Sequence, residues 1–436
     1  MENKRYTRED IERIVEEENV EFIRLQFTDI FGTLKNVAIT KNNLSKALDN
    51  RFLFDGTYIN GFDTEEESDM FLYPDLDTFE IFPWRPQSGK VARLICDVYT
   101  TDGEPLFHDP RRILKKVLKE QRDNGIVFNI GPECEFFLFQ TDDQGRPTTD
   151  NLEDDGYLDL GHSDMGENVR RDMVFTLEDM NFDIESSYHE KGKGQHEIDF
   201  KYVDALNAAD DIMTFKLAVK NIAKKHGLIA SFMPKPIQDA VGSGMHINVS
   251  LNEYGDNIFY DENDENKLSE KAYQFIAGVL KHLKGMSLIT NPIVNSYKRL
   301  QGGKYVPNNI AFASKGKKAA IRTPYIKGRE HARIEIKSPD ATCNPYLAIA
   351  VIIAAGMDGI NNKLDYREYD LEKAENIEKL PVCMGEAIEA FEKDDFIRGV
   401  IGDYVSEKYI EQKKIEWHEY LGTVSNWELD KYFMRG

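Results

Sequence analysis

The sequence has no long apolar run, no paired cysteines and no excess of positive charge. No apolar segment reaches the roughly 20 residues that span a membrane, and residues 1–5 lack the apolar core of a signal peptide. The four cysteines are widely spaced without a Cys-x-x-Cys pair, which is typical of reduced thiols. A formal charge of -22 disfavours nucleic acid or an anionic membrane as a partner. We therefore expect a cytoplasmic protein with no nucleic acid and no membrane partner.

The length of 436 residues exceeds what one hydrophobic core usually organises, so two domains are expected. A hydrophobic content of 41% suits a globular protein. Asp109 is a good helix cap and Pro110 fits the first helical position, so a new unit begins near His108. We predict a small domain over residues 1–107 and a larger one over residues 108–436.

Strands and helices are mixed in both parts, which predicts the α+β class. In the first part, Thr7 begins a capping box at the start of a helix. Alternating apolar residues predict strands around residues 23–27, up to residue 39, and over residues 91–99. The segment 54–70 reads as rich in loops.

The larger part is expected to begin with a helix from Pro110 to a stop at Gly125. Apolar periodicity and turn residues then predict strands over 129–139, 229–233 and 245–251, a hairpin over 184–202, and helices over 208–226, 270–289 and 345–360.

One predicted strand carries two acidic residues within an apolar stretch. Side chains two apart on a strand point to the same face, so Glu133 and Glu135 project together. Adjacent carboxylates repel each other unless cations or protons lie between them. Such a pair alone is more often part of a solvated sheet face. Acidic and histidine side chains later in the chain make a metal site possible here.

Four later residues are candidates to complete such a site. Glu190 and Glu197 flank a glycine-rich hairpin turn, His246 opens a strand after a Gly-Ser-Gly turn, and Glu335 lies on a further strand. Each of them alone is more often a surface or structural residue. Five Glu and one His make an oxygen-rich set that suits Mg²⁺ or Mn²⁺ rather than zinc.

The charge is unevenly distributed. Between Lys298 and Lys337 there are eleven Lys or Arg residues against two acids. A basic segment in an acidic protein indicates a site for phosphates or carboxylates. A solvated basic face is the alternative.

Several ordered stretches closely resemble the glutamine synthetase family, in its bacterial type I, Bacillus-like branch. The resemblance runs nearly end to end. The stretches are Phe54-Asp55-Gly56, Ser68-Asp69-Met70, Tyr73-Pro74-Asp75-Leu76, Gly131-Pro132-Glu133, Gly194-Gln195-His196-Glu197, Met233-Pro234-Lys235-Pro236, Gly242-Ser243-Gly244-Met245-His246, Asn295-Ser296-Tyr297-Lys298-Arg299 and Asn344-Pro345-Tyr346-Leu347.

The resemblance implies a fold, an assembly and a reaction. The fold would be a small β-grasp-like N-terminal domain plus a larger C-terminal catalytic domain with a curved antiparallel sheet flanked by helices. The assembly would be a dodecamer of two hexameric rings with active sites between subunits. The reaction would be ATP-dependent ligation of glutamate, or a similar acid, to ammonia or an amine through a γ-glutamyl phosphate.

The resemblance also implies roles for individual residues. Two or more Mg²⁺ or Mn²⁺ ions would be held by two sets, Glu135, Glu190 and Glu197 on the amino-acid side, and Glu133, His246 and Glu335 on the nucleotide side. ATP, the co-substrate, would contact Tyr202, Asn248, Ser250, Lys317 and Arg333. The amino-acid substrate would lie against Gly242, His246, Arg299 and Lys337. Arg322 would face the transferred phosphate, and Asp55 of an adjacent subunit would bind ammonium and help to deprotonate it.

The sequence departs from the family where the amine and the amino acid would bind. Tyr305 stands in place of a flap Glu, and Lys replaces Arg at 317 and at 337. A tyrosine cannot supply the charge of a carboxylate at neutral pH, and a lysine loses the bidentate fork of arginine. Val241, Tyr58 and Thr64 are further departures.

Three readings stay open on these residues. The chain is a ligase that uses ammonia, a γ-glutamyl ligase for a bulkier amine such as a polyamine, ethanolamine or methylamine, or a non-catalytic regulatory homologue.

Overall fold

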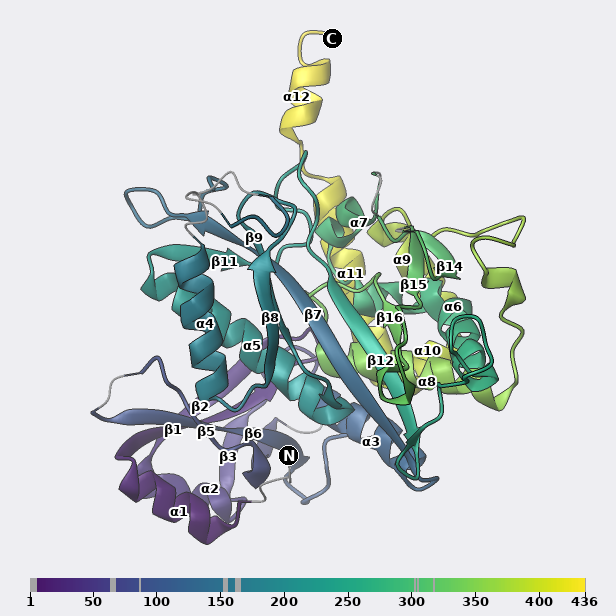
Figure 1. The fold of residues 1–436 in the computed structure, drawn as a ribbon. Helices are drawn as coiled ribbons and strands as arrows, with labels where there is room; N and C mark the ends of the chain where they lie inside the picture. The colour runs from purple at the N-terminus through teal and green to yellow at the C-terminus, as the bar shows by residue number, and fades with distance from the viewer. Residues whose placement is uncertain are drawn as a thin grey trace.

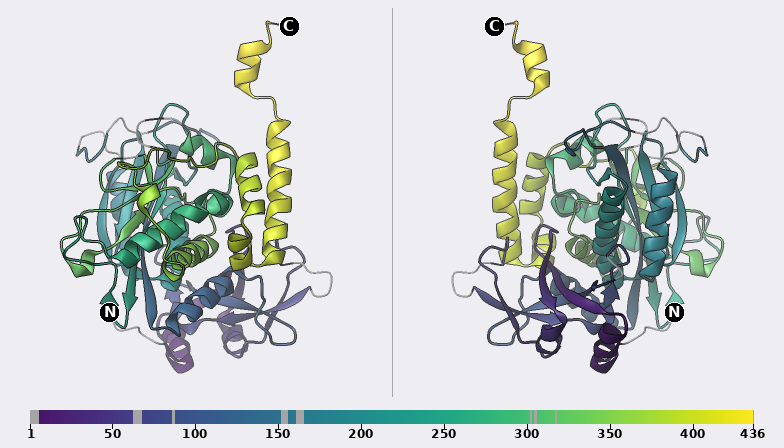
Figure 2. Two further views of the ribbon diagram at one scale, coloured as in Figure 1. Left: turned by 90° about the vertical axis from the view of Figure 1, so that its right-hand side faces the viewer. Right: turned by 90° about the vertical axis from the view of Figure 1, so that its left-hand side faces the viewer.

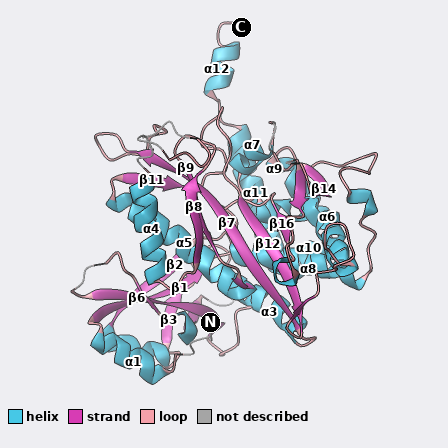
Figure 3. Cartoon of the chain, in the orientation of Figure 1, coloured by secondary structure: helices cyan, strands magenta, loops and turns pink. Residues whose placement is uncertain are grey.

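The computed structural model describes residues 6–62, 68–85, 88–151, 156–160, 166–301, 303, 306–316 and 318–435. The strands of these residues form a six-stranded and a ten-stranded sheet. The smaller sheet lies at one end of the molecule, and the larger sheet crosses its middle with helices packed against it (Figures 1 and 3). This arrangement confirms the predicted α+β class.

The smaller sheet follows the order β2-β1-β6-β4-β3, with β5 paired to β6. Its two central strands, β1 and β6, run parallel. The strands are β1 (Val20–Thr28), β2 (Leu34–Thr40), β3 (Phe52–Asp55), β4 (Asp69–Pro74), β5 (Glu80–Ile81) and β6 (Lys90–Thr100), and the helices are α1 (Arg8–Glu17) and α2 (Leu44–Leu48). This unit is the small β-grasp-like domain that the family resemblance implies.

The first helix shows how local sequence sets an element. The Thr7 backbone N–H donates to the Asp10 carboxylate at 3.0 Å, and the Thr7 hydroxyl accepts from the Asp10 N–H at 3.1 Å. This capping box satisfies backbone donors that the first turn of a helix leaves free. Ile11 and Val15, four residues apart, are buried against the sheet.

The larger sheet follows the order β14-β15-β16-β12-β7-β9-β8, and β7 also pairs with β10 and β11. All of its pairs are antiparallel except β14 with β15, which run parallel. The strands are β7 (Ile126–Gln140), β8 (Ile184–His189), β9 (Gln195–Phe200), β10 (Val203–Asp204), β11 (Leu228–Ser231), β12 (Met245–Glu253), β13 (Asp256–Asn257), β14 (Asn309–Ala313), β15 (Ala319–Arg322) and β16 (Ile334–Ile336).

One face of the larger sheet packs on helices and the other carries polar residues. Alternation along β7 places Phe136 on the helix side, where its ring contacts Phe215 of α5 and Phe232. The helices are α3 (Pro110–Arg122), α4 (Glu167–Asp179), α5 (Ala205–Lys225), α6 (Glu270–Thr290), α7 (Val294–Leu300), α8 (Pro345–Asn361), α9 (Met384–Lys393), α10 (Asp395–Ile401), α11 (Asp403–Leu421) and α12 (Asn426–Tyr432).

Glycines allow two central helices to cross closely. A Cβ added to Gly278 of α6 would lie 2.1 Å from a backbone oxygen of α8, and one added to Gly359 of α8 would lie 1.9 Å from the Gln274 oxygen. The backbones of α6 and α8 therefore touch where neither helix carries a side chain. Figure 2 shows these helices stacked on one side of the sheet.

Two predictions of local structure were incomplete. The segment expected to be rich in loops, 54–70, overlaps the end of β3 and the start of β4, which pair antiparallel. Helix α4 was not predicted, and neither were the helices after residue 383. The predicted helix at 345–360 is confirmed as α8, and most of its residues are buried.

A buried arginine joins the two units. Arg111 of α3 is 4% exposed and binds Asp75 and Asp97 of the smaller unit at 2.8 Å each. On its other side it binds Asp210 of α5 at 2.9 Å, and the Tyr346 hydroxyl donates to the same carboxylate at 2.7 Å. Charge-assisted hydrogen bonds thus fix the smaller sheet against the helices of the larger unit.

The C-terminal helix projects from the body. Helix α12 stands clear of the other elements in all three views (Figures 1 and 2). Its large side chains are exposed, with Trp427 at 61% and Tyr432 at 53%, and Phe433 directly after the helix is 76% exposed. In the described part of the chain, no helix is long and apolar enough to cross a membrane.

Candidate active site

A cavity of about 630 Å³ opens on the polar face of the larger sheet. Its walls combine carboxylates from β7 and β9 with basic side chains from the segment 299–337. The lining residues include Glu133, Glu135, Glu190, Glu197, His246, Arg299, Arg322, Glu335 and Lys337. The predicted metal, acid-binding and phosphate-binding residues thus meet in one place.

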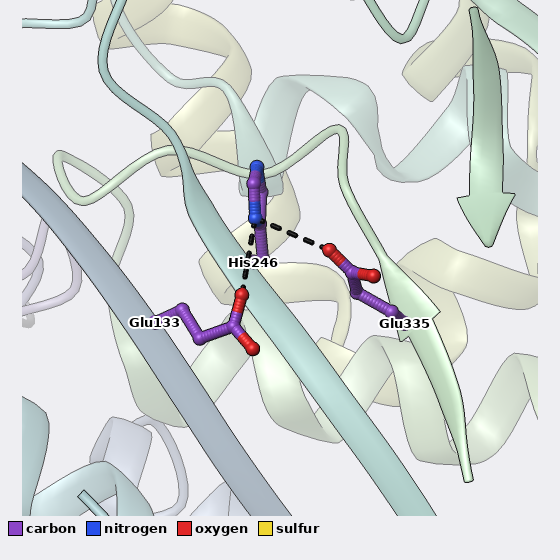
Figure 4. Close-up of side chains that lie close together, drawn as sticks. All are labelled: Glu133, His246 and Glu335. Atoms are coloured by element: carbon purple, nitrogen blue, oxygen red, sulfur yellow. Dashed lines mark hydrogen bonds and ion pairs between the residues drawn. The ribbon is translucent and has the colours of Figure 1, made fainter. Parts of the chain in front are cut away.

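The first cluster is formed by three adjacent strands. His246 of β12 pairs with Glu133 of β7, while Glu335 of β16 pairs with Asn248 of β12. Nδ1 of His246 lies 3.3 Å from a carboxylate oxygen of Glu133 and 3.3 Å from one of Glu335 (Figure 4). The strand pairing therefore joins three residues that are far apart in the sequence.

The second cluster lies beside the first on β7. Glu135 pairs with Glu197 of β9, and Glu190 enters from the turn between β8 and β9. One oxygen from each of the three residues lies within 4.8 Å of the others. The Gly244 N–H donates to Glu135 at 2.6 Å, and Lys191 donates to Glu190 from both its backbone N–H and Nζ at 2.9 Å.

The electrostatics of the two clusters differ. Burial raises the pKa of Glu135, and burial together with neighbouring carboxylates raises the pKa of Glu197 well above its usual range. Burial alone would raise the pKa of Glu133, but the His246 hydrogen bond and charge outweigh it, so that pKa is lowered. Burial likewise opposes the charged form of His246, yet the surrounding carboxylates raise its pKa overall.

These donor sets fit hard divalent cations. Each cluster brings three ligand atoms within 4.8 Å of one another, and five of the six residues offer carboxylate oxygens. Magnesium and manganese prefer such oxygen-rich sets, and two carboxylate-linked positions can serve one phosphoryl transfer. In the second cluster Lys191 pairs with Glu190, but the pKa values of Glu135 and Glu197 are still raised, and a bound cation would supply the further positive charge that stabilises these carboxylates.

A buried arginine lies under the glycine loop at one end of the cavity. Arg299 of α7 is 7% exposed and donates to the backbone oxygens of Ser338 at 2.7 Å and Lys337 at 2.9 Å. A Cβ on Gly242 would lie 2.7 Å from the Arg299 side chain, and one on Gly244 would lie 2.4 Å from its guanidinium. These glycines are required because the loop lies directly against the arginine.

Lys337 also lines the cavity, at the end of β16. Burial lowers the pKa of its ammonium. On the neighbouring strand β15, Arg322 pairs with Glu335, and its Nε donates to that carboxylate. Lys337 and Arg322 thus place positive charge beside the first cluster.

The predicted nucleotide contacts lie along one edge of this arrangement. Asn248 donates to Glu133 at 2.8 Å and accepts from Arg333 Nε at 3.3 Å. Ser250 follows on β12, and Tyr202 lies against Gly131 with 56% of its surface exposed. Arg333, Asn248 and Glu133 are thus linked in that order by hydrogen bonds, whereas Ser250 and Tyr202 are not part of this hydrogen-bonded row.

Some predicted residues do not line the cavity. Asp55, at the end of β3, is exposed on the smaller unit and accepts from the Thr57 N–H at 2.9 Å. It is not among the residues that line the cavity of its own chain. Lys317, Tyr305 and Thr64 lie outside the described residues.

Sequence reasoning missed several residues that line the site. Gln195 is 1% exposed, and its Nε2 donates to the Gly242 oxygen at 3.1 Å and lies 3.4 Å from Glu135. It therefore ties the glycine loop to the second cluster. Lys191, Lys235, Tyr157 and Tyr188 also line the cavity. For Gln195 the signal was its place at the start of β9, two residues before Glu197.

Comparison with family models gives two matches. Residues 19–101 match the model described as glutamine synthetase, beta-Grasp domain, and residues 107–432 match the one described as glutamine synthetase, catalytic domain. Among individual proteins, the glutamine synthetase of Clostridium saccharobutylicum is 53% identical over 98% of this chain and 99% of that protein. The Staphylococcus aureus glutamine synthetase is 52% identical over 99% of each.

Solved structures have the same fold. The GmaS–ADP complex superposes with a TM-score of 0.86 at 30% identity, covering 97% of this chain and 99% of that one. The Plasmodium falciparum glutamine synthetase gives 0.88 at 24% identity, covering 98% and 99%, which is a likeness of fold. By its sequence and by its fold, the chain belongs to the glutamine synthetase family.

Proposed function

We propose that the protein synthesises glutamine from glutamate, ammonia and ATP. The observation that carries this proposal is the convergence of two three-residue metal clusters with Arg299 and Lys337 in one cavity. Metal ions held by such clusters suit phosphoryl transfer from ATP. The positively charged side chains of Arg299 and Lys337 suit the carboxylates of an amino acid.

Membership of the family makes the chain a carbon–nitrogen ligase that joins an acid to ammonia or an amine. Ammonia is favoured over a bulkier amine because the relatives at 51–53% identity are named glutamine synthetases. A non-catalytic role is disfavoured because both clusters are fully assembled. The ADP in the GmaS complex supports an adenine nucleotide as the phosphate donor.

The residues can be given roles in this reaction. A carboxylate is a poor acyl donor, so phosphorylation by ATP to a γ-glutamyl phosphate precedes attack by the amine. The two clusters would together hold two or more Mg²⁺ or Mn²⁺ ions in each active site. These ions would screen the electrostatic repulsion between ATP and glutamate. Arg299, Lys337, Gly242 and the edge of His246 would hold the glutamate, and Arg322 would neutralise charge on the transferred phosphoryl group.

The nucleotide would lie along the hydrogen-bonded row of Glu133, Asn248 and Arg333. Ser250, Tyr202 and Lys317 would contact it at the edge of this row. Asn248 would hold the Glu133 carboxylate in place by its hydrogen bond. Arg333, two residues before Glu335, would bring positive charge to the phosphates.

Ammonium must lose a proton before it can attack, and Asp55 is the proposed acceptor. Its hydrogen bonds with Thr57 lower its pKa, which keeps it ionised and able to bind a cation. Because Asp55 is exposed and apart from the cavity of its own chain, the proposal requires a neighbouring subunit. The proposal therefore includes a dodecamer of two hexameric rings. In each subunit, a domain boundary near His108 would separate the domain that carries Asp55 from the domain that forms the cavity.

We also propose that the enzyme works in the cytoplasm. All four cysteines are free thiols in the described chain, and three of them are buried, as is common in reducing compartments.

The decisive experiment measures ADP and glutamine with purified protein, ATP, Mg²⁺, glutamate and ammonium. ADP release that requires both glutamate and ammonium, with stoichiometric glutamine, is the expected result. Methylamine, ethanolamine and putrescine form the comparison panel. Turnover with one of these amines but not with ammonium would overturn the proposal.

A variant control links turnover to the cavity. Glu335→Gln removes a ligand of the first cluster and should lower kcat by at least 100-fold. Glu330→Gln, an exposed acidic residue in the same segment, should leave kcat within twofold. Equal activity of Glu335→Gln and wild type would show that the cavity is not the site of the reaction.

A further inference from the structure

A further acidic side chain lies beside the two metal clusters. Asp199 is two residues beyond Glu197 on β9, so both side chains leave the same face of that strand. Glu197 pairs with Glu135 of β7, and Asp199 pairs with Glu133. Residues directly opposite in an antiparallel pair share a face, with Cβ atoms about 5 Å apart. Each acidic residue of β7 therefore has an acidic neighbour on β9.

Asp199 has only half of its acceptor capacity in use. The Ser186 hydroxyl of β8 donates to Oδ2 of Asp199 at 2.6 Å. The other oxygen, Oδ1, is buried and has no N–H or hydroxyl donor among the described residues, and the side chain lies next to the Glu197 carboxyl group. A buried acceptor without a donor is costly and often marks the place of a water or an ion.

The position of Asp199 separates it from the direct ligands. In the described chain it belongs to neither group of three whose ligand atoms lie within 4.8 Å of one another. It instead continues a row across the sheet, with Ser186, Asp199, Glu133 and His246 on neighbouring strands. It is therefore next to a ligand rather than among the ligands.

We propose that Asp199 is a positioning residue that holds a water molecule bound to the cation of Glu133, His246 and Glu335. This inference rests on the proposed function, because it requires that cation. Magnesium dehydrates reluctantly and keeps several waters when proteins bind it. A second carboxylate that accepts a hydrogen bond from such a water orients it and strengthens metal binding.

A purely structural role does not explain the charge. Asparagine would accept the Ser186 hydrogen bond equally well. A carboxylate at this place adds repulsion with Glu133 and Glu197 as long as no cation is bound. A cation in the first cluster would give this negative charge a positively charged partner.

The experiment measures Mn²⁺ binding to the metal-free protein by the electron paramagnetic resonance signal of free Mn²⁺. Asp199→Asn keeps the size and the Ser186 contact and removes the charge. The dissociation constant of one Mn²⁺ site should rise about 10- to 100-fold. Glu185→Gln is the matched control, since Glu185 is exposed and lies next to Ser186 at an irregularity in the pairing of β8 with β9. It removes the same charge and should change binding less than twofold.

Two more variants keep the test independent of folding. Ser186→Ala frees the Asp199 side chain and should weaken Mn²⁺ binding in the same direction by a smaller factor. Asp199→Glu retains the charge and should recover part of the affinity. In the glutamine assay, the Mg²⁺ concentration for half-maximal activity should rise in Asp199→Asn while kcat at saturating Mg²⁺ falls much less.

Wild-type Mn²⁺ affinity in Asp199→Asn would overturn the inference, and so would an equal loss in Glu185→Gln. These results are distinguishable from failure of the proposed function. If wild type binds Mn²⁺ but forms no glutamine, the proposed function fails while the role of Asp199 is still decided by the binding data.

Discussion

Glu135 and Glu197 face each other across β7 and β9, and both belong to one cluster of carboxylates on the cavity wall. Burial raises the pKa of both side chains because the charged forms lose their water. The metal-free site is therefore electrostatically unfavourable, and cation binding and protein stability are linked at this place.

Glu197→Gln should raise the stability of the metal-free protein and reduce the stabilisation that a bound metal provides. In EDTA at pH 8, the variant should melt at a higher temperature than wild type because one buried negative charge is removed. With saturating Mn²⁺, the increase in melting temperature should be smaller than that of wild type because one ligand is missing. Differential scanning fluorimetry measures both. Glu178→Gln, on the exposed surface of α4, is the control, and an equal Mn²⁺ response in Glu197→Gln and wild type would contradict the assignment.

Arg299→Lys should weaken glutamate binding specifically. The guanidinium of Arg299 donates to backbone oxygens of Ser338 and Lys337, and a lysine cannot make both contacts and also reach a substrate carboxylate. The KM for glutamate should rise about tenfold or more, while the KM for ATP changes less than twofold. Steady-state kinetics with one substrate varied at a time test this.

Arg329→Lys serves as the control for that variant, because Arg329 lies in the same basic segment and its guanidinium lies over the Tyr260 ring rather than in the cavity. An equal rise of both KM values in Arg299→Lys would indicate general damage to the site instead of a lost carboxylate contact.

Asp109 should contribute a pH dependence to stability. Burial, together with the charge of Asp97, raises the pKa of Asp109 to about 7. An unfolded aspartate titrates near 3.9, so between pH 4 and 7 the folded state holds a proton that the unfolded state releases. This group therefore makes the protein less stable as the pH rises from 4 to 7, by at most about 1.4 kcal/mol per pH unit, with no further change above 7.

Asp109→Asn cannot lose a proton and should remove this slope. Relative to wild type, its free energy of unfolding should improve as the pH rises from 4 to 7, on top of a constant cost for the altered hydrogen bond with the Val98 N–H. Urea denaturation at several pH values gives the comparison, with Asp123→Asn at the exposed end of α3 as the control. A constant difference between Asp109→Asn and wild type at every pH would refute the prediction.

Two glycines should respond to alanine with opposite signs. At Gly359 the new methyl group would lie 1.9 Å from the Gln274 oxygen, so α6 and α8 would have to separate. Gly359→Ala should cost about 1–3 kcal/mol or more. Gly399, in α10, has nothing within 4 Å of an added Cβ, and Gly399→Ala should add up to about 1 kcal/mol through helix propensity. Thermal melts of the two variants measure the difference, and a gain in melting temperature for Gly359→Ala would contradict the close crossing.

Local patterns were sufficient to predict much of the fold. The capping box at Thr7, the Asp109-Pro110 helix start and the apolar alternation around Glu133 each depend on neighbours in sequence, and the structure confirms them. Helix α4 could also have been found, since Val169, Met173 and Leu177 recur every four residues.

The assembly of the site could not be predicted from local patterns. Whether His246 meets Glu133 and Glu335 depends on the order and register of β7, β12 and β16, which are set by long-range pairing. The resemblance to a family supplied that grouping in advance. Asp199 shows the opposite case, because the alternation that singled out Glu135 after Glu133 applies equally to Asp199 after Glu197.

The buried contacts of Arg111 have a mechanical consequence. Turning the smaller sheet relative to the helices would pull Asp75 and Asp97 away from a guanidinium that water scarcely reaches. Breaking buried ion pairs of this kind costs about 3–5 kcal/mol, even though Asp210 would stay bound to the arginine. The contacts of Arg111 therefore oppose rotation between the smaller and the larger sheet. Asp55, on the smaller sheet, is held in a fixed position relative to the larger sheet of its own chain. A rotation of the smaller sheet toward the larger one would first have to break these contacts.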